Sequence, residues 1–238
     1  MSISKSLSRL ADYYRRHGLA RTIGRAGLAG KRAFFAGRMV IFYCDLNERV
    51  LPRVDAPKNL KVERITALTE LRAEHLQEMT CFWNPVQVNR NIRERFEKGA
   101  SLWLVMCEGK LASYGWTLRG ATIEPYYFPL TQNDVHLFDF HVFPQYRGHG
   151  INPYLIGQIL DGLATNGAGR AFIEAAEWNG AQLSSLRKTP FRCLGLVRTF
   201  AIFGQVYVSW NRSHPDMQVH TGAESKDHIL KTARSNQH

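Results

Sequence analysis

The segment Val142-Phe143-Pro144-Gln145-Tyr146-Arg147-Gly148-His149-Gly150-Ile151 decides the fold of this protein. An apolar, β-like run precedes it and an apolar, helical run follows it. A strand that ends in a glycine-containing turn and then opens a helix presents unpaired backbone N–H groups at the positive end of a helix dipole. This arrangement predicts a binding site for a phosphate group.

The spacing of the glycines excludes two common nucleotide-binding motifs. A P-loop requires Gly-x-x-x-x-Gly-Lys-Ser/Thr, which the sequence lacks. A dinucleotide fingerprint requires a third glycine three residues after Gly150, where Pro153 stands. Gly148 and Gly150 still let a bulky anion approach the backbone, and Arg147 adds a charged donor. The sequence therefore predicts a phosphate cradle of another type, from about Gln145 to Ile151.

Composition limits the class of protein and its partners. The chain has 238 residues, a net charge of +11 and 45% hydrophobic residues, which is typical of one globular domain with appendages. Its four cysteines are far apart and form no metal-binding pattern, so we expect reduced thiols and no metal. No window approaches the length of a membrane span and no secretory signal is visible, so a cytoplasmic location is expected.

Basic residues are concentrated near the N-terminus. Eight lysines and arginines lie between Met1 and Gly37, against the single acid Asp12, and apolar residues recur there at helical spacing. We expect residues 1–58 to form a basic helical extension with a strand and a connector. It either packs on the main domain with a solvated basic face or contacts an anionic membrane, at the inner face, as a peripheral helix. An Arg- and Ser-rich start also resembles an organellar transit peptide.

Residues 59–210 are predicted to form the main domain, and residues 211–238 a mobile polar tail. Hydrophobic periodicity predicts strands and helices in mixed order, including one strand before the domain boundary. The predicted strands cover residues 39–46, 60–65, 102–107, 111–118, 135–142, 170–176, 196–203 and 205–210, and the helices residues 66–79, 88–99, 151–163 and 179–188. Gly115 indicates a β-bulge in the fourth of these strands.

The glycine turn resembles the central motif of the GNAT superfamily of acyl-CoA-dependent N-acyltransferases. That motif is Gln/Arg-x-x-Gly-x-Gly/Ala, and residues 145–150 match it; Asn179 and Phe191 also keep the interval of a second family block, with Pro190 where glycine is usual. The resemblance implies an α/β (α+β) fold with a mixed, mostly antiparallel twisted sheet flanked by helices. It also implies acetyl-CoA as co-substrate, held by Val142, Gln145, Tyr146, Arg147, Gly148, His149, Gly150, Ile151 and Asn179.

Catalytic candidates lie on the strand before the turn. In this family a splay between two strands admits the pantetheine arm, and a backbone N–H near Val142 stays free for the thioester. The strand carries His136, Asp139 and His141, and His136 occupies the place where several members have a base. Strict alternation puts Asp139 and His141 on one face and His136 on the other, unless a bulge changes the phase. A structural role for His136 and Asp139 is the alternative.

The proton donor for the leaving thiolate is less clearly marked. Many family members have a tyrosine seven residues after the Asn, but this sequence has Leu186 there. Ser184 or Ser185 is the candidate donor; the alternatives are that the thiolate leaves into water or that the chemistry has been lost. The resemblance places the acceptor pocket near the segment between the first two helices. The expected acceptor-binding residues are Phe82, Trp83, Asn84, Tyr126 and Glu174.

Two functions follow. The first is an N-acetyltransferase that transfers an acetyl or acyl group from acetyl-CoA to a primary amine by direct attack, through a tetrahedral intermediate. Its acceptor is a small molecule, an amino sugar or a peptide. The second is a catalytically degenerate acyl-CoA-binding module, tethered to a membrane or another anionic partner by its N-terminal helix. Nucleic acid is not favoured, because charge is the only signal for it.

Overall fold

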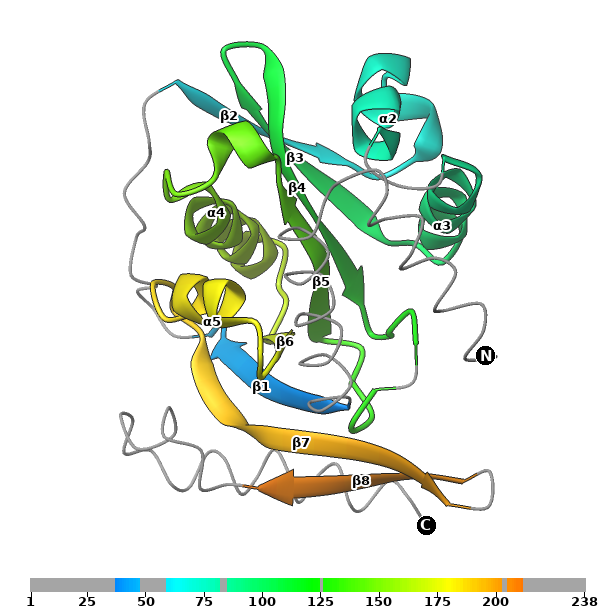
Figure 1. The fold of residues 1–238 in the computed structure, drawn as a ribbon, viewed down its shortest axis with the longest axis vertical. Coiled ribbons are helices and arrows are strands. Elements are labelled where there is room, and N and C mark those ends of the chain that lie inside the picture. Colours follow the sequence, from blue (N-terminus) through cyan, green and yellow to red (C-terminus); the bar gives the residue numbers. More distant parts are fainter. Residues whose placement is uncertain (1–36, 48–58, 82–84, 125, 203–204, 212–238) are drawn as a thin grey trace, which may run out of the picture.

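The computed structural model describes residues 37–47, 59–81, 85–124, 126–202 and 205–211. Within these ranges the chain forms one eight-stranded sheet with helices on both faces (Figure 1). The strand order is β2-β3-β4-β5-β6-β1-β7-β8, and β5–β6 is the only parallel pair of hydrogen-bonded neighbours among the described strands. The predicted basic helix in residues 1–36 and residues 212–238 of the predicted tail lie outside the described residues, whereas Asn211 ends β8. The strands are β1 (Arg38–Asp45), β2 (Leu60–Ile65), β3 (Ser101–Cys107), β4 (Lys110–Arg119), β5 (Asp134–Val142), β6 (Arg170–Ala176), β7 (Arg192–Ile202) and β8 (Gln205–Asn211).

Strand β1 lies inside the sheet, between β6 and β7, and is antiparallel to both. Its residues from Val40 to Cys44 are all buried, which explains why this run is apolar throughout instead of alternating. Residues on both sides of the expected boundary at residue 59 therefore contribute to a single sheet.

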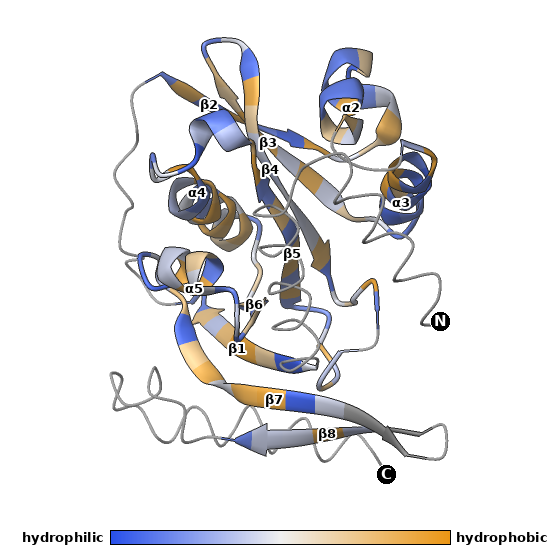
Figure 2. Cartoon of the chain, viewed as in Figure 1, coloured by the Kyte–Doolittle hydropathy of each residue, from blue (hydrophilic) through white to orange (hydrophobic). Residues whose placement is uncertain are grey.

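Helices cover the two faces of the sheet. On one face lie α2 (Ala73–Thr80) and α3 (Pro85–Glu97), and on the other α4 (Ile151–Thr165) and α5 (Gly180–Leu186) (Figure 1). The apolar positions predicted for the third helix are buried along α4, which Figure 2 shows as the most apolar of the helices. The mixed, mostly antiparallel sheet flanked by helices confirms the predicted fold class. No helix in the described ranges is long and apolar enough to cross a bilayer.

The first predicted helix is shorter than expected. Residues 66–79 form a 3₁₀ turn, η1 (Leu68–Glu70), and then α2. Arg72 has extended backbone angles, and the carboxylate of Glu70 accepts the backbone N–H of Thr66 at 2.8 Å. The extended backbone of Leu71 and Arg72 ends the 3₁₀ turn before α2 begins, so a continuous helix does not form here.

Strands β5 and β6 separate at their C-terminal ends. They pair only from Asp134 to Leu137 against Arg170 to Ile173, although β5 continues to Val142. The predicted splay between these strands is therefore present, and it lies beside the glycine turn.

A β-bulge at Asp139 interrupts the strict alternation of side chains along β5. Tyr114 of β4 pairs with His141 and Trp116 pairs with Phe138, so Asp139 and Phe140 together oppose Gly115. Asp139 has a left-handed backbone (φ 51°). A Cβ on Gly115 would lie 2.5 Å from the Phe140 ring, so glycine is required there.

The bulge changes which side chains share a face. Phe140 and Val142 pack with the α4 core, whereas His141 stacks on Tyr114 on the α3 side. His136 also lies on the α3 side, where its ring stacks on Phe138. His136 and His141 therefore lie on the same side of the sheet, which is the predicted exception to strict alternation, because the inserted residue shifts the two-residue period by one.

Candidate active site

The glycine turn forms the predicted strand-turn-helix cradle. Gly148 and Gly150 have left-handed backbones (φ 82° and 73°), and a Cβ on either would meet no atom within 4 Å. The carbonyl of Gly150 accepts the first helical bond from the N–H of Tyr154, so the N–H groups of Ile151 and Asn152 have no partner within α4. The two glycines thus allow the left-handed backbone of the turn, and they leave open space in front of these N–H donors.

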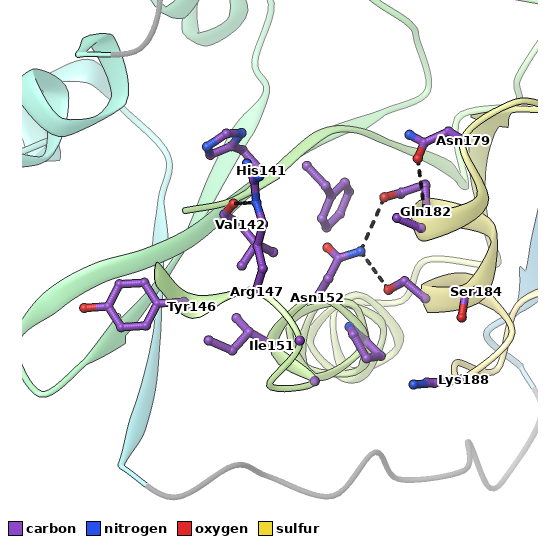
Figure 3. Close-up of a pocket in the computed structure, with 16 residues that line it drawn as sticks. His141, Val142, Tyr146, Arg147, Ile151, Asn152, Asn179, Gln182, Ser184 and Lys188 are labelled. Carbon is purple, nitrogen blue, oxygen red and sulfur yellow. Dashed lines mark hydrogen bonds between the residues drawn. The ribbon is translucent and has the colours of Figure 1, made fainter. Parts of the chain in front are cut away.

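A cavity of about 490 Å³ opens directly in front of the cradle (Figure 3). Its walls are the end of β5, the turn, the first turn of α4, and α5 on the far side of the splay. The residues that line it are Phe140, His141, Val142, Tyr146, Arg147, Gly148, Gly150, Ile151, Asn152, Pro153, Asn179, Ala181, Gln182, Ser184, Ser185 and Lys188. We refer to it as the cofactor cavity. Of the predicted cofactor residues, Gln145 and His149 are exposed and do not line it.

The backbone of Val142 faces the splay. The N–H of Phe143 donates to Ala112 of β4, so the alternation of an antiparallel ladder directs the N–H and C=O of Val142 the other way. Nε of Arg147 donates to this carbonyl at 3.0 Å (Figure 3). The carbonyl keeps a second lone pair, and the N–H points toward the cavity side.

His141 lies between the cofactor cavity and the α3 side of the sheet. It lines the cavity, stacks on Tyr114 with ring centroids 5.5 Å apart, and meets Phe143 edge to face at 5.1 Å. Burial lowers the pKa of His141 below its usual 6.5, and the charge of Arg147 lowers it further, against an opposing contribution from Asp139. The imidazole is therefore neutral at pH 7 and able to accept a proton.

Helix α5 supplies hydroxyl groups to the opposite wall. Asn179 caps the helix, because its Oδ1 accepts the backbone N–H of Gln182 at 3.2 Å. Nδ2 of Asn152, from α4, donates to Oγ of Ser185 at 2.9 Å, and the predicted donor Ser184 also lines the cavity (Figure 3). Leu186 is completely buried in the core and faces away from this chemistry.

A second cavity, of about 420 Å³, lies on the other face of the sheet, between α2, α3 and the strands β4 and β5. We call it the acceptor cavity, after the role that we propose for it below. It is lined by Met79, Gln87, Val88, Asn91, Ile92, Arg95, Tyr114 and Asp139. Asp139 of the catalytic candidates is placed here, beside Tyr114, on which His141 stacks. The predicted acceptor residues Phe82, Trp83 and Asn84 lie outside the described residues.

Three of the predicted residues come together away from both cavities. Nε2 of His136 lies 2.9 Å from Oε2 of Glu174, and the ring of Tyr126 packs against the imidazole at 4.8 Å. Burial, and then the charge of Glu174, raises the pKa of Tyr126 well above its usual value. None of the three lines the cofactor cavity or the acceptor cavity. This buried cluster favours the structural alternative for His136.

Sequence reasoning missed Arg95, Tyr114 and Asn152 as parts of the site. Arg95 and Tyr114 belong to patterns that predict an ordinary amphipathic helix and a buried strand, and nothing in those patterns distinguishes them. A usable signal was present for the strand faces, since Gly115 indicated a bulge, and a bulge reverses the alternation of its neighbour.

The cofactor cavity fits a coenzyme A moiety. Unpaired N–H groups at the start of α4 suit a pyrophosphate, and Arg147 and Lys188 add positive charge. No group of three or more His, Cys, Asp or Glu side chains that could hold a metal occurs in the described part of the chain.

The sequence model of the Acetyltransferase (GNAT) family matches residues 68–186, which is half of the chain. The protein belongs to this family, and the match indicates an acyltransferase; members generally use acetyl-CoA. A search of curated proteins finds no match.

The chain is similar to solved structures at low sequence identity. A putative GNAT acetyltransferase from Novosphingobium aromaticivorans is 16% identical, with a TM-score of 0.44, covering 66% of this chain and 60% of its own. A GNAT acetyltransferase from Colwellia psychrerythraea is 13% identical, with a TM-score of 0.47, covering 66% of this chain and 52% of its own. This chain thus spans less than two thirds of the length of either.

Proposed function

We propose that the protein is an N-acetyltransferase that transfers the acetyl group of acetyl-CoA to a primary amine by direct attack. One observation carries this proposal: consecutive residues of β5 line two cavities on opposite faces of the sheet. Asp139 lines the acceptor cavity, and Phe140, His141 and Val142 line the cofactor cavity. The bulge keeps Phe138 and Asp139 on the same side of the sheet, so that Phe140 and Val142 lie on the side of the cofactor cavity.

His141 is the proposed general base. It lines the cofactor cavity and stacks on Tyr114, which lines the acceptor cavity, so it stands where an amine and a thioester would meet. Its lowered pKa keeps it neutral, as proton removal from an attacking amine requires. His136 is the less suitable base, because Glu174 and Tyr126 enclose it outside both cavities.

The remaining roles belong to groups around the splay. The N–H of Val142 donates a hydrogen bond to the developing oxyanion, and acetyl-CoA supplies the acyl group as a thioester. The hydroxyl of Ser185 would donate a hydrogen bond to the departing thiolate, because its oxygen accepts a bond from Asn152 and this leaves its O–H as a donor. Ser184, which also lines the cavity, is the second hydroxyl in reach of this wall.

The test is the release of free thiol from acetyl-CoA with a panel of primary amines, together with calorimetric binding of CoA. We expect amine-dependent thiol release that His141→Gln reduces by about 10²- to 10⁴-fold, the usual contribution of a general base. CoA affinity should change little in that variant. Undiminished turnover in His141→Gln would overturn the assignment of the base.

An acyl-CoA-binding module without turnover is the second candidate. The observation that favours it is Leu186, which is buried and carries no proton where many relatives have a tyrosine. Tight CoA binding without thiol release, with any amine of the panel, would support this candidate and contradict the enzyme. A tether to an anionic membrane would rest on residues 1–36 and belongs to the same proposal.

A further inference from the structure

The acceptor cavity contains one positive and one negative side chain, held side by side. Among the eight residues that line it, Arg95 and Asp139 are the charged ones. Nη1 of Arg95 lies 2.5 Å from Oδ2 of Asp139. The cavity is therefore close to neutral in net charge but strongly dipolar, and a complementary ligand carries both signs of charge.

Arg95 is fixed in place by the sheet. Its guanidinium lies over the rings of Trp116 and Phe138, at 5.1 Å and 5.4 Å from their centroids, and its side chain is only 16% exposed. A guanidinium has five N–H donors in a planar fork, and the bond to Asp139 uses one of them. The remaining donors suit a planar carboxylate at the cavity wall.

Asp139 is presented by the bulge. Its left-handed backbone (φ 51°) turns the carboxylate toward α3, and 43% of the side chain is exposed although Arg95 holds one oxygen. An ionised carboxylate accepts about four hydrogen bonds, so it can also receive an ammonium or amine group. The next two residues of β5 line the cofactor cavity, so an amine at Asp139 lies on the path to the thioester.

We propose that the acceptor is a small α-amino acid, with its amine at Asp139 and its carboxylate at Arg95. This inference rests on the proposed acetyltransferase function and names its substrate class. In an α-amino acid the two charged groups are attached to one carbon, and they match a pair of opposite charges in direct contact. Asn91 and Gln87 of α3 add amide groups to the cavity wall.

Polycationic acceptors fit this surface poorly. A polyamine or aminoglycoside needs several acidic side chains, and the lining residues include one acid, which is already paired with an arginine.

The experiment compares acceptors that differ only in the carboxylate. Thiol release from acetyl-CoA is measured for each of the common L-amino acids, for its carboxamide and for the amine without the carboxyl group, with spermidine and kanamycin as polycations. We expect kcat/KM for the preferred amino acid to exceed that for its amide and amine by about 10- to 100-fold, the value of a charge-assisted hydrogen bond. Equal or faster turnover of amides, simple amines or polycations would overturn the proposal.

Variants of α3 provide the second measurement. Arg95→Gln should remove the preference for acid over amide, and Arg95→Lys should keep part of it. Arg90→Gln is the matched control, because Arg90 lies on the same helix with its side chain 68% exposed, and the preference should not change. The ratio of two kcat/KM values does not depend on how much of a variant is folded. An unchanged ratio in Arg95→Gln contradicts the role of Arg95.

Failure of this inference differs from failure of the acetyltransferase proposal. If amines without a carboxylate react and amino acids do not, the enzyme stands and the substrate class is wrong. If no amine reacts, calorimetry of the same amino acids with the CoA-saturated protein decides the binding claim separately. If none of the amino acids binds, the proposal that the acceptor cavity binds an α-amino acid is overturned.

Discussion

Replacement of Gly150 by valine tests the cofactor cradle most directly. Gly150 has a left-handed backbone (φ 73°), and a Cβ there meets no atom of the protein within 4 Å. The substitution therefore creates no clash within the fold, and its cost in stability is the backbone strain alone, about 1–3 kcal/mol. For a protein of this length, each kcal/mol lowers Tm by about 2–4 °C.

The effect on CoA binding should be much larger. The new side chain projects into the open space in front of the N–H groups of Ile151 and Asn152. Loss of two hydrogen bonds from these donors to a charged pyrophosphate costs about 3 kcal/mol or more, which raises Kd by about a hundredfold or more. Isothermal titration calorimetry with CoA measures this change, and thermal denaturation measures the strain.

Gly167→Val is the matched control. Gly167 also has a left-handed backbone (φ 68°) with no atom within 4 Å of a Cβ, but it follows the C-terminal end of α4. The 15 residues of α4 separate it from the cradle by about 22 Å. We expect the same loss of Tm in both variants and a loss of CoA affinity in Gly150→Val alone. Unchanged affinity in Gly150→Val, or an equal loss in Gly167→Val, would refute the cradle.

Three further predictions concern the chemistry and the core. Because the pKa of His141 is lowered, its neutral form persists below pH 6.5. We therefore expect kcat/KM to fall only as the pH drops through that lowered pKa. His141→Gln should abolish this acidic limb of the pH–rate profile. The same sign applies to stability: the contribution of His141 is complete above about pH 6.5 and is lost as pH falls through the folded-state pKa. Ser185→Ala and Asn152→Ala should each lower kcat by about 2- to 10-fold at unchanged CoA affinity. Because one hydrogen bond links the two side chains, the double variant should be no slower than either single variant. Additive losses of kcat in the double variant would contradict this link. Leu186→Ala should lower the free energy of unfolding by about 2–5 kcal/mol, measured by urea denaturation, and a loss below about 1 kcal/mol would contradict its place in the core.

Much of the fold could be predicted from hydrophobic periodicity and from the turn-forming residues between the elements. The hairpin of β3 and β4, strand β5 and helix α4 all appear where alternating or helical apolar patterns predict them. These elements depend on contacts close in sequence, and each pattern extends over several residues. The pattern failed at the first helix, where the extended backbone of Leu71 and Arg72 separates the 3₁₀ turn from α2.

The sequence predicted the glycine turn of the candidate site but not the arrangement of the side chains around it. The cradle depends on a short motif whose glycines set backbone conformation, and the structure places Gly148 and Gly150 in the left-handed conformation that it requires. The side chains around it depend on the relative positions of separate elements. Arg95 reaches Asp139 because α3 packs across the sheet, and Asn152 reaches Ser185 because α4 and α5 lie together.

The sequence by itself determined the family, the class of fold and the position of the glycine turn that we propose as the cofactor cradle, because these follow from local spacing and backbone chemistry. Only the tertiary structure decided which histidine lies between the two cavities. A single inserted residue at Asp139 reverses the faces of β5, and it is accommodated because Gly115 on the neighbouring strand leaves room for the Phe140 ring. The position of one side chain relative to another across a sheet depends on pairing register, and register is set by packing between strands distant in the chain.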